Sequence, residues 1–181
     1  MVSFLLNKDD FLGYQDEPLY KILTELDIKA DNYLNIEPNI ILKPAHLGSS
    51  IGISIIKNLY DFNMAFSKSF TFDNKVLVEK VIPEFRELNC SIKKTVFGVK
   101  SSKVSEENQD GFYSFEDKYI GSRKTSTTSK RKFPAELPKD IQSIIQAISA
   151  KVYYLLGAKG VVRIDYMYDE ENAIIYLNEI N

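Results

Sequence analysis

The chain has little of several features that mark out whole classes of protein. Its 181 residues include one cysteine and one histidine, which excludes an internal disulfide framework and argues against a zinc site. No apolar run approaches the roughly 20 residues of a membrane-spanning helix, and the N-terminal residues show no signal-peptide pattern. The formal net charge of −2 predicts no field for a nucleic acid or a membrane surface. We therefore expect a cytoplasmic protein that binds neither of these.

What is present is typical of a globular protein. The hydrophobic content is 44% and the charged content 27%, and the length allows one domain or two small ones. Cys90 alternates with Leu88 and Ile92, which predicts a small buried hydrophobe. Residues 98–132 are polar, and connections of that length are usually functional or disordered. We read the basic part of this segment, 123–132, as a solvated loop rather than an RNA-binding surface.

Hydrophobic periodicity predicts alternating helices and strands along most of the chain. The opening residues show no clean strand or helix start. The clearest element is a helix over 138–156, whose apolar residues keep the 3–4 spacing and which Gly157 ends. The other expected helices cover 16–26 and the residues after Asp61, which we expect to be the N-cap. The expected strands cover 39–43, 53–56, 76–79, 86–96 and the two arms of a C-terminal hairpin.

The C-terminal hairpin carries the most informative residues. Side chains on a strand alternate between faces, so Arg163 and Asp165 share one face, and Glu179 and Asn181 share a face of the next strand. A turn at 169–172 brings the two polar faces together. Oxygen ligands of this kind suit Mg²⁺ held together with substrate phosphates. The alternative is the solvated face of an edge hairpin.

A second motif begins with Lys43 at the end of a strand and continues into a loop over 44–52 with Ser49 and Ser50. Backbone N–H groups and hydroxyls of such a loop can surround an anion. Pro44 keeps the strand exit extended and leaves Lys43 facing one side. Taken alone, the same loop is also compatible with a plain β-turn.

Two further segments complete the pattern. Glu79 ends a buried strand that runs into a linker, 80–82, and Glu87 follows. A linker of this kind can offer backbone groups to an adenine edge while a carboxylate holds ribose hydroxyls. Residues 112–119 form an aromatic, lysine-bearing island in a polar loop, a composition that suits a lid excluding water above a phosphate.

In this order and spacing, the motifs resemble those of the D-alanine–D-alanine ligase family of the ATP-grasp superfamily. The resemblance rests on KPAHLGSSIGI, VLVEKVI with REL, FYSFEDKY and VVRIDYMYDEENAIIYLNEIN, and it covers residues 40–181. It implies an α+β fold of mostly antiparallel sheets with packed helices, in which two subdomains enclose the nucleotide. The smaller subdomain would cover 1–78, and the larger 79–181 with the lid 98–132.

The resemblance also implies roles for single residues. ATP would be bound by residues of the first three motifs and the lid: Lys43, Ser49, Ser50, Glu79, Lys80, Val81, Ile82, Glu87, Tyr113 and Lys118. Arg163, Ser49 and Tyr119 would act in catalysis, Arg163 on the oxyanion and Tyr119 in sealing the lid and orienting Ser49. Two Mg²⁺ ions, with Mn²⁺ as an alternative, would be held by Asp165, Glu179 and Asn181. The lysine expected before the first helix has no clear match, since Asp16-Glu17 stands there and Lys8 is an alternative.

The implied reaction joins two D-alanine molecules at the expense of ATP, through an acyl phosphate, for peptidoglycan synthesis. The implied full-length protein is a homodimer. We expect the sequence to be truncated at both ends, the second after Asn181, and the fragment to be inactive alone. Two alternatives stay open: another ATP-grasp carboxylate–amine ligase, and a nucleotide-binding module without catalysis.

Overall fold

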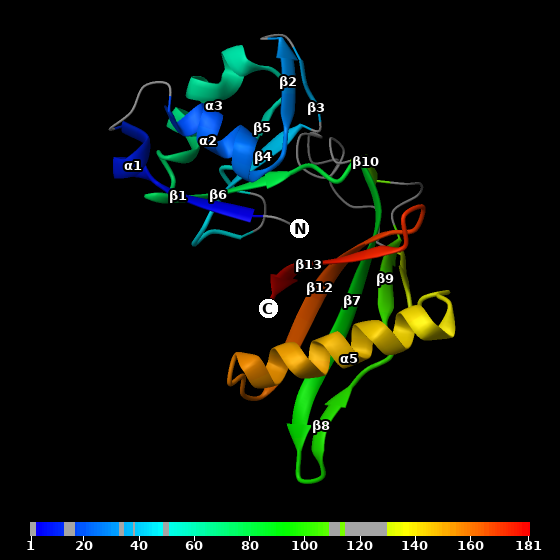
Figure 1. The fold of residues 1–181 in the computed structure, drawn as a ribbon. Helices are drawn as coiled ribbons and strands as arrows, with labels where there is room; N and C mark the ends of the chain where they lie inside the picture. Colours follow the sequence, from blue (N-terminus) through cyan, green and yellow to red (C-terminus); the bar gives the residue numbers. More distant parts are fainter. Residues whose placement is uncertain are drawn as a thin grey trace. The chain divides into compact units, whose positions relative to one another are not determined.

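The computed structural model describes residues 3–12, 17–32, 35–37, 39–48, 51–108, 113–114 and 130–181. Within these residues every pair of hydrogen-bonded strands is antiparallel, and helices pack on the sheets (Figure 1). This confirms the expected α+β class. None of the described helices is both long and apolar enough to cross a membrane.

The chain divides into two compact units, Met1–Ile82 and Pro83–Asn181. The domain boundary expected from the sequence, 78/79, would cut through β6 (Lys75–Lys80). That strand is an inner strand of the first sheet and pairs with β1 on one side and β4 on the other. Its hydrogen bonds therefore hold all of it in the first unit.

The first unit is built on a four-stranded sheet in the order β1-β6-β4-β5. Its elements besides β6 are β1 (Ser3–Asn7), α1 (Lys8–Leu12), α2 (Glu17–Glu25), β2 (Lys29–Asn32), β3 (Asn35–Glu37), β4 (Ile40–Pro44), β5 (Ser54–Ile56), the 3₁₀ turn η1 (Leu59–Asp61) and α3 (Phe62–Ser69). β2 and β3 form a separate two-stranded sheet. The expected strands at 39–43, 53–56 and 76–79 and the helices at 16–26 and after Asp61 are thus present.

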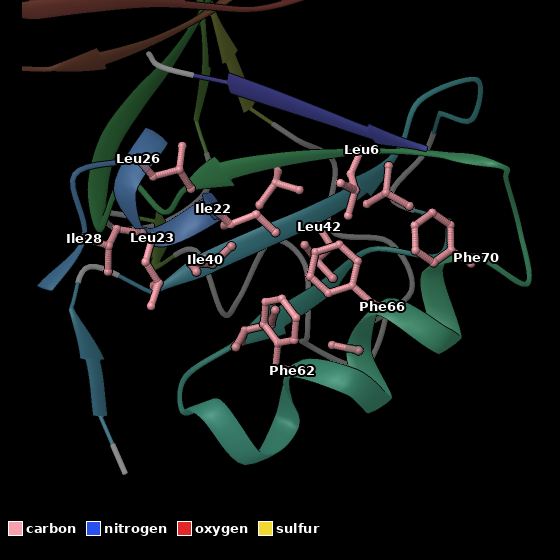
Figure 2. Packing of buried hydrophobic residues seen from close by; sticks show 14 residues of the cluster. Leu6, Ile22, Leu23, Leu26, Ile28, Ile40, Leu42, Phe62, Phe66 and Phe70 are labelled. Atoms are coloured by element: carbon pink, nitrogen blue, oxygen red, sulfur yellow. The ribbon is translucent and has the colours of Figure 1, made fainter. Parts of the chain in front are cut away.

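The hydrophobic core of the first unit lies on one face of this sheet. Alternate residues of β4 and β6 point into it, among them Ile40, Leu42, Val76 and Val78, all fully buried. α3 covers them with its phenylalanine side chains, and Figure 2 shows their rings lying on the strand side of the helix. The fully buried Phe66 ring lies 4.7 Å from that of Phe62, centroid to centroid.

Two features of this unit differ in part from the expectations. Residues 3–7 form a regular edge strand, paired residue by residue with β6, although their own pattern gives no clean start. Asp61 is the N-cap residue of α3, as expected, but its side chain makes no capping hydrogen bond. It instead accepts a hydrogen bond from Asn58 Nδ2 at 2.7 Å, while Asn58 Oδ1 accepts one from the Asp61 N–H.

The second unit contains a larger sheet, with the path β11-β9-β7-β12-β13 and with β8 and β10 both paired to β7. Its elements are β7 (Glu84–Thr95), β8 (Gly98–Ser101), β9 (Ser105–Asn108), β10 (Tyr113–Ser114), β11 (Lys130–Lys132), α5 (Lys139–Leu155), β12 (Val161–Asp169) and β13 (Ile174–Ile180). The segment 98–132, read from sequence as one long polar connection, thus contributes strands to the sheet at both ends.

The core of this unit lies between α5 and one face of the sheet (Figure 1). The buried line of α5 follows a strict spacing of four: Ile141, Ile145, Ser149 and Tyr153. The sequence predicts a broader stripe, of which Ile148 and Val152 also pack against this core, whereas Leu155 is 75% exposed. Ser149 is accommodated because its hydroxyl donates to the Ile145 carbonyl at 2.8 Å and bonds the Tyr166 hydroxyl at 2.7 Å.

Two local predictions for this unit are confirmed. Cys90 is fully buried in the core, and burial raises the pKa of its thiol. Gly157 follows the end of α5 with φ 58°, a left-handed conformation that glycine adopts without strain.

Candidate functional site

The β12–β13 hairpin forms as the sequence predicts. Asp165 and Glu179 are direct cross-strand partners, and the backbones of Arg163 and Asn181 exchange two hydrogen bonds of 2.9 and 2.8 Å. In the connecting turn, Asp169 accepts hydrogen bonds from the N–H and the side chain of Asn172. Because partners in register project to the same face, the four polar side chains converge on one side of a paired ribbon.

Three of these side chains are joined by hydrogen bonds around the Asp165 carboxylate. Arg163 Nε donates to Oδ1 at 2.7 Å and Nη2 donates to Oδ2 at 2.8 Å. The Asn181 amide donates to Oδ2 at 3.0 Å. The guanidinium binds the carboxylate through two parallel hydrogen bonds, a bidentate geometry that makes arginine–carboxylate pairs strong and fixes their orientation.

The electrostatics of this group keep Arg163 charged. Its hydrogen bonds to Asp165 raise the pKa of the guanidinium above its usual value, and the negative charges of Asp165, Glu179 and Glu107 add to the rise. Asp165 is 5% exposed, while nearly half of the Arg163 side chain faces solvent. A buried carboxylate therefore anchors an accessible cation.

The register of the sheet extends this polar face beyond the hairpin. Asp165 opposes Asn89 on β7, and Asn89 in turn opposes Ser105 on β9. All three are buried. Arg131 of β11 donates from Nη2 to the Ser105 hydroxyl at 2.7 Å. One row of polar side chains thus crosses the sheet from β11 to β13. The sequence pattern did not predict a place in this site for Arg131, Ser105 or Asn89.

Glu87, expected to bind ribose, lies on this same face. It opposes Met167, one side-chain step along β12 from Asp165. Residues 87 and 89 share the face because the side chains of β7 alternate. The alternation in 86–96 could have found Asn89, but only the strand pairing places it beside Asp165.

In the first unit, two predicted site residues form an ion pair. Lys43 Nζ lies 2.7 Å from Glu79 Oε2, and their side chains are 18% and 7% exposed. The other carboxylate oxygen of Glu79 accepts a hydrogen bond from the Ser3 hydroxyl at 2.8 Å. The pairing arises because Ile41 opposes Glu79, which makes Lys43 its diagonal neighbour on the outer face of the sheet.

The linker after Glu79 has part of its hydrogen-bonding capacity already in use. The Val81 N–H donates to the Asn39 carbonyl at 2.7 Å. Lys80 extends β6 and its ammonium donates to the Asp27 carbonyl at 3.2 Å. Val81 and Ile82 are both buried. A nucleotide base at this edge would meet apolar side chains and the backbone groups that remain.

Several expected site residues lie outside the described part of the chain. These are Ser49, Ser50, Lys118 and Tyr119. For Tyr113 the structure gives the backbone, which pairs with Phe85 of β7. Beside the loop that follows Lys43, the His46 N–H and imidazole both bond the Asp73 carboxylate, with the N–H at 2.7 Å from Oδ2. This contact fastens the beginning of the loop to the start of β6.

The oxygen atoms around Asp165 decide whether a divalent ion fits this site. Across the described ranges, no three His, Cys, Asp or Glu side chains are grouped as a metal site. The hairpin offers two carboxylates, Asp165 and Glu179, with the amide oxygen of Asn181. Asp165 Oδ1 accepts only one of the hydrogen bonds described above, which leaves it room for a further interaction. In proteins, Mg²⁺ is usually bound by a few carboxylate or carbonyl oxygens, and water and substrate phosphates supply its remaining ligands.

Comparison with known proteins identifies relatives of the whole arrangement. Residues 18–181 match the family described as D-ala D-ala ligase C-terminus. The D-alanine–D-alanine ligase of Thermosipho melanesiensis is 36% identical over all of this chain and 48% of its own length. That of Pelodictyon phaeoclathratiforme is 38% identical over 77% of this chain and 37% of its own. This chain therefore spans less than half the length of these relatives.

Solved structures agree with this in fold. The D-alanyl-alanine synthetase A of Vibrio cholerae superposes with a TM-score of 0.72 at 25% identity, covering 99% of this chain and 48% of that one. The VanG D-Ala:D-Ser ligase of Enterococcus faecalis gives a TM-score of 0.69 at 24% identity, covering 99% and 46%. With the family match spanning nearly the full sequence, the chain belongs to the D-alanine–D-alanine ligase C-terminal family.

Proposed function

We propose that this chain takes part in the ATP-dependent joining of two D-alanine molecules and supplies the nucleotide- and metal-binding part of the reaction. The observation that carries the proposal is the Asp165 carboxylate, fixed by Arg163 and Asn181 and opposed across the strands by Glu179. Family membership supports the substrate class. It also supports a cytoplasmic location and a homodimer as parts of the proposal.

In this proposal, Lys43 acts on the α- and β-phosphates of ATP. Its ammonium already lies beside a carboxylate, so binding exchanges one anionic partner for another or shares the ammonium between them. Glu79, released or shared, turns toward the adenine. Ser49, Ser50, Tyr113 and Lys118 complete the phosphate contacts, and Glu87 meets the ribose.

Arg163 is proposed to stabilise the negative charge that develops on the reacting carboxylate of the first D-alanine. A cation held in place by two hydrogen bonds stabilises such charge without having to reorganise during the reaction. The carboxylate attacks the γ-phosphate to give an acyl phosphate, and the amine of the second D-alanine then displaces phosphate. Tyr119 would help to exclude water from the acyl phosphate.

Asp165, Glu179 and Asn181 would hold two Mg²⁺ ions, with Mn²⁺ as the substitute. When bound, the metal neutralises phosphate charge and orients the transferring phosphoryl group. The rigid pairing of the two strands keeps these three ligands in register, which is the contribution of the protein itself.

Calorimetric titration with ADP in the presence and absence of Mg²⁺ tests the proposal. We expect Mg²⁺-dependent binding that Lys43→Ala and Glu179→Gln each weaken at least about tenfold, equivalent to about 1.4 kcal/mol. The matched controls are Lys75→Ala, an exposed lysine of β6, and Glu171→Gln, an exposed carboxylate of the hairpin turn. Equal binding by all four variants would contradict the proposed site.

A further inference from the structure

The β7–β8 hairpin carries two large apolar side chains at its tip. Val96 and Phe97 join the strands and are 93% and 98% exposed. Hydrogen bonds fix the turn, since the Thr95 hydroxyl donates to the Gly98 carbonyl at 2.8 Å and accepts from the Phe97 N–H at 3.2 Å. Gly98, at φ 115°, allows the turn. Figure 1 shows the hairpin extending past α5. Single exposed apolar residues need no explanation, but a projecting pair on a hydrogen-bonded turn indicates a partner.

The arms of the same hairpin are basic. Residues 91–104 contain four lysines and neither aspartate nor glutamate, a local charge of +4 in a chain whose formal net charge is −2. The four are Lys93, Lys94, Lys100 and Lys103, all exposed. At physiological ionic strength a charge is felt over about 8 Å, so this local charge, not the net charge, governs what the hairpin attracts.

Two of these lysines are set directly against each other. Lys93 and Lys100 are cross-strand partners, an arrangement of like charges that destabilises a strand pair. No carboxylate in the part of the chain that the structure describes forms an ion pair with either. Two neighbouring ammonium groups repel each other, and an anion bound beside both would remove that repulsion.

A cavity lies beside this pair. It has a volume of about 330 Å³, and Lys93 and Lys100 line it together with Ser91, Ser101 and Val161. All of these belong to the second unit. The space is large enough for a phosphate-bearing headgroup beside the two lysines.

We propose that the β7–β8 hairpin docks on an anionic phospholipid surface. Val96 and Phe97 enter the boundary between headgroups and acyl chains, and Lys93 and Lys100 meet lipid phosphates at the cavity. The order of groups along the hairpin favours a bilayer over other polyanions. Apolar side chains lead and cations follow a few residues behind, as at a membrane interface. A nucleic acid needs no leading apolar tip, and a projecting tip is not a groove for an acidic peptide.

The first part of the test measures binding to vesicles. The protein is sedimented with vesicles of phosphatidylcholine alone or mixed with phosphatidylglycerol. We expect binding only to the anionic vesicles, weakened by added salt. At about fivefold per lysine, Lys93→Gln/Lys100→Gln lowers the partition coefficient about 30-fold. Phe97→Ser lowers it about tenfold. The double variant Lys75→Gln/Lys139→Gln removes the same charge from exposed sites elsewhere and should bind as the parent does.

The second part measures insertion. The chain has no tryptophan, so Phe97→Trp introduces a single reporter at the tip. We expect its fluorescence to shift to the blue on anionic vesicles and to be quenched by brominated acyl chains. Met64→Trp, at an exposed position of α3, should respond to neither. Thermal unfolding of each variant checks that the fold is intact.

Several results would overturn the proposal. These are no binding to anionic vesicles, equal binding to neutral ones, equal loss in the control double variant, or indole fluorescence of the Phe97→Trp variant that the vesicles leave unchanged. Binding to heparin or DNA that the hairpin lysines govern, without vesicle binding, would assign the basic arms to another polyanion instead.

Discussion

Lys43 and Glu79, to which the family resemblance assigns different parts of the nucleotide, form a 2.7 Å ion pair across neighbouring strands. Both side chains are largely buried, so neither group can lose the other without a new partner or solvent taking its place. The pair therefore holds Lys43, the lysine that we propose binds phosphate, on the outer face of β4 before any ligand arrives.

The ion pair should appear as a coupling energy. Because removing one member leaves a largely buried charge unpaired, Lys43→Met should lower the free energy of unfolding by about 3 kcal/mol. With Glu79→Gln added, the loss should be smaller than the sum of the single losses, by about 1–3 kcal/mol. Urea unfolding of the four proteins measures this double-mutant cycle. Strict additivity would mean that the two groups do not interact.

Two arginines in the second unit should respond differently to replacement by lysine. Arg86 bonds both Glu106 oxygens, Glu170 and a backbone carbonyl, with its side chain 16% exposed. Among the described residues, the Arg163 side chain bonds Asp165 alone, and it is 46% exposed. Since one ammonium cannot reproduce the planar fork, Arg86→Lys should cost about 3 kcal/mol and Arg163→Lys about 1 kcal/mol of stability. Chemical denaturation measures both, and the reverse order would contradict the geometry.

Stability at acid pH should depend on Asp73. Burial tends to raise the pKa of its carboxyl, but hydrogen bonds from the N–H groups of His46 and Lys75 and from the His46 ring outweigh it and hold the pKa at about 2, below the ordinary 3.8. A depressed pKa stabilises the fold above the unfolded value, and the stabilisation is lost as pH falls from about 4 to 2. Asp73→Asn should therefore flatten the stability profile in this window by about 1–2 kcal/mol, after allowance for solvent screening.

That difference is measured by unfolding parent and variant at intervals between pH 2 and pH 6. Asp61→Asn, another carboxylate of the first unit, is a useful comparison because it should leave the Asp73 contribution in place. Parallel profiles for the parent and Asp73→Asn would show that the His46–Asp73 contact does not contribute to folding.

The aromatic cluster under α3 should dominate the stability of the first unit. Phe66 is fully buried, with Phe11 stacked at 4.9 Å and Phe62 at 4.7 Å between ring centroids. Phe66→Ala should cost about 3–5 kcal/mol because it removes ring contacts and leaves a cavity. Phe66→Leu should cost less. Phe72→Ala, at a 46% exposed position, serves as the control, and similar losses for Phe66→Ala and Phe72→Ala would contradict the packing.

The sequence sufficed for the C-terminal hairpin because two local signals agreed there. The alternation around Ile164 and the turn residues from Asp169 to Asn172 predict the hairpin, and the structure has it. Its register shifts between Asp165 and Tyr166, and this shift, which the sequence pattern does not show, places Glu179 opposite Asp165. The helix over 138–156 was found for the same reason. In each case the residues that decide the structure are neighbours in the chain.

The rest depends on which strands lie side by side, and alternation within a single strand does not contain that information. β1 becomes a strand because β6, far along the chain, offers it an edge. Asn89 and Ser105 become neighbours of Asp165 only through the order β9-β7-β12. The Lys43–Glu79 pair likewise follows from the diagonal register of β4 and β6. Net charge is an average over the whole chain, and it does not show the local +4 of residues 91–104.

The central claim, that the β12–β13 hairpin holds a divalent ion together with a nucleotide, is tested most directly by counting bound Mn²⁺ by electron paramagnetic resonance with and without ADP. The account predicts that ADP tightens Mn²⁺ binding and that Asp165→Asn and Glu179→Gln each weaken it at least about tenfold, or about 1.4 kcal/mol. Glu171→Gln in the turn should leave it unchanged. Mn²⁺ binding that ADP does not affect, or that both ligand variants retain in full, would contradict the account.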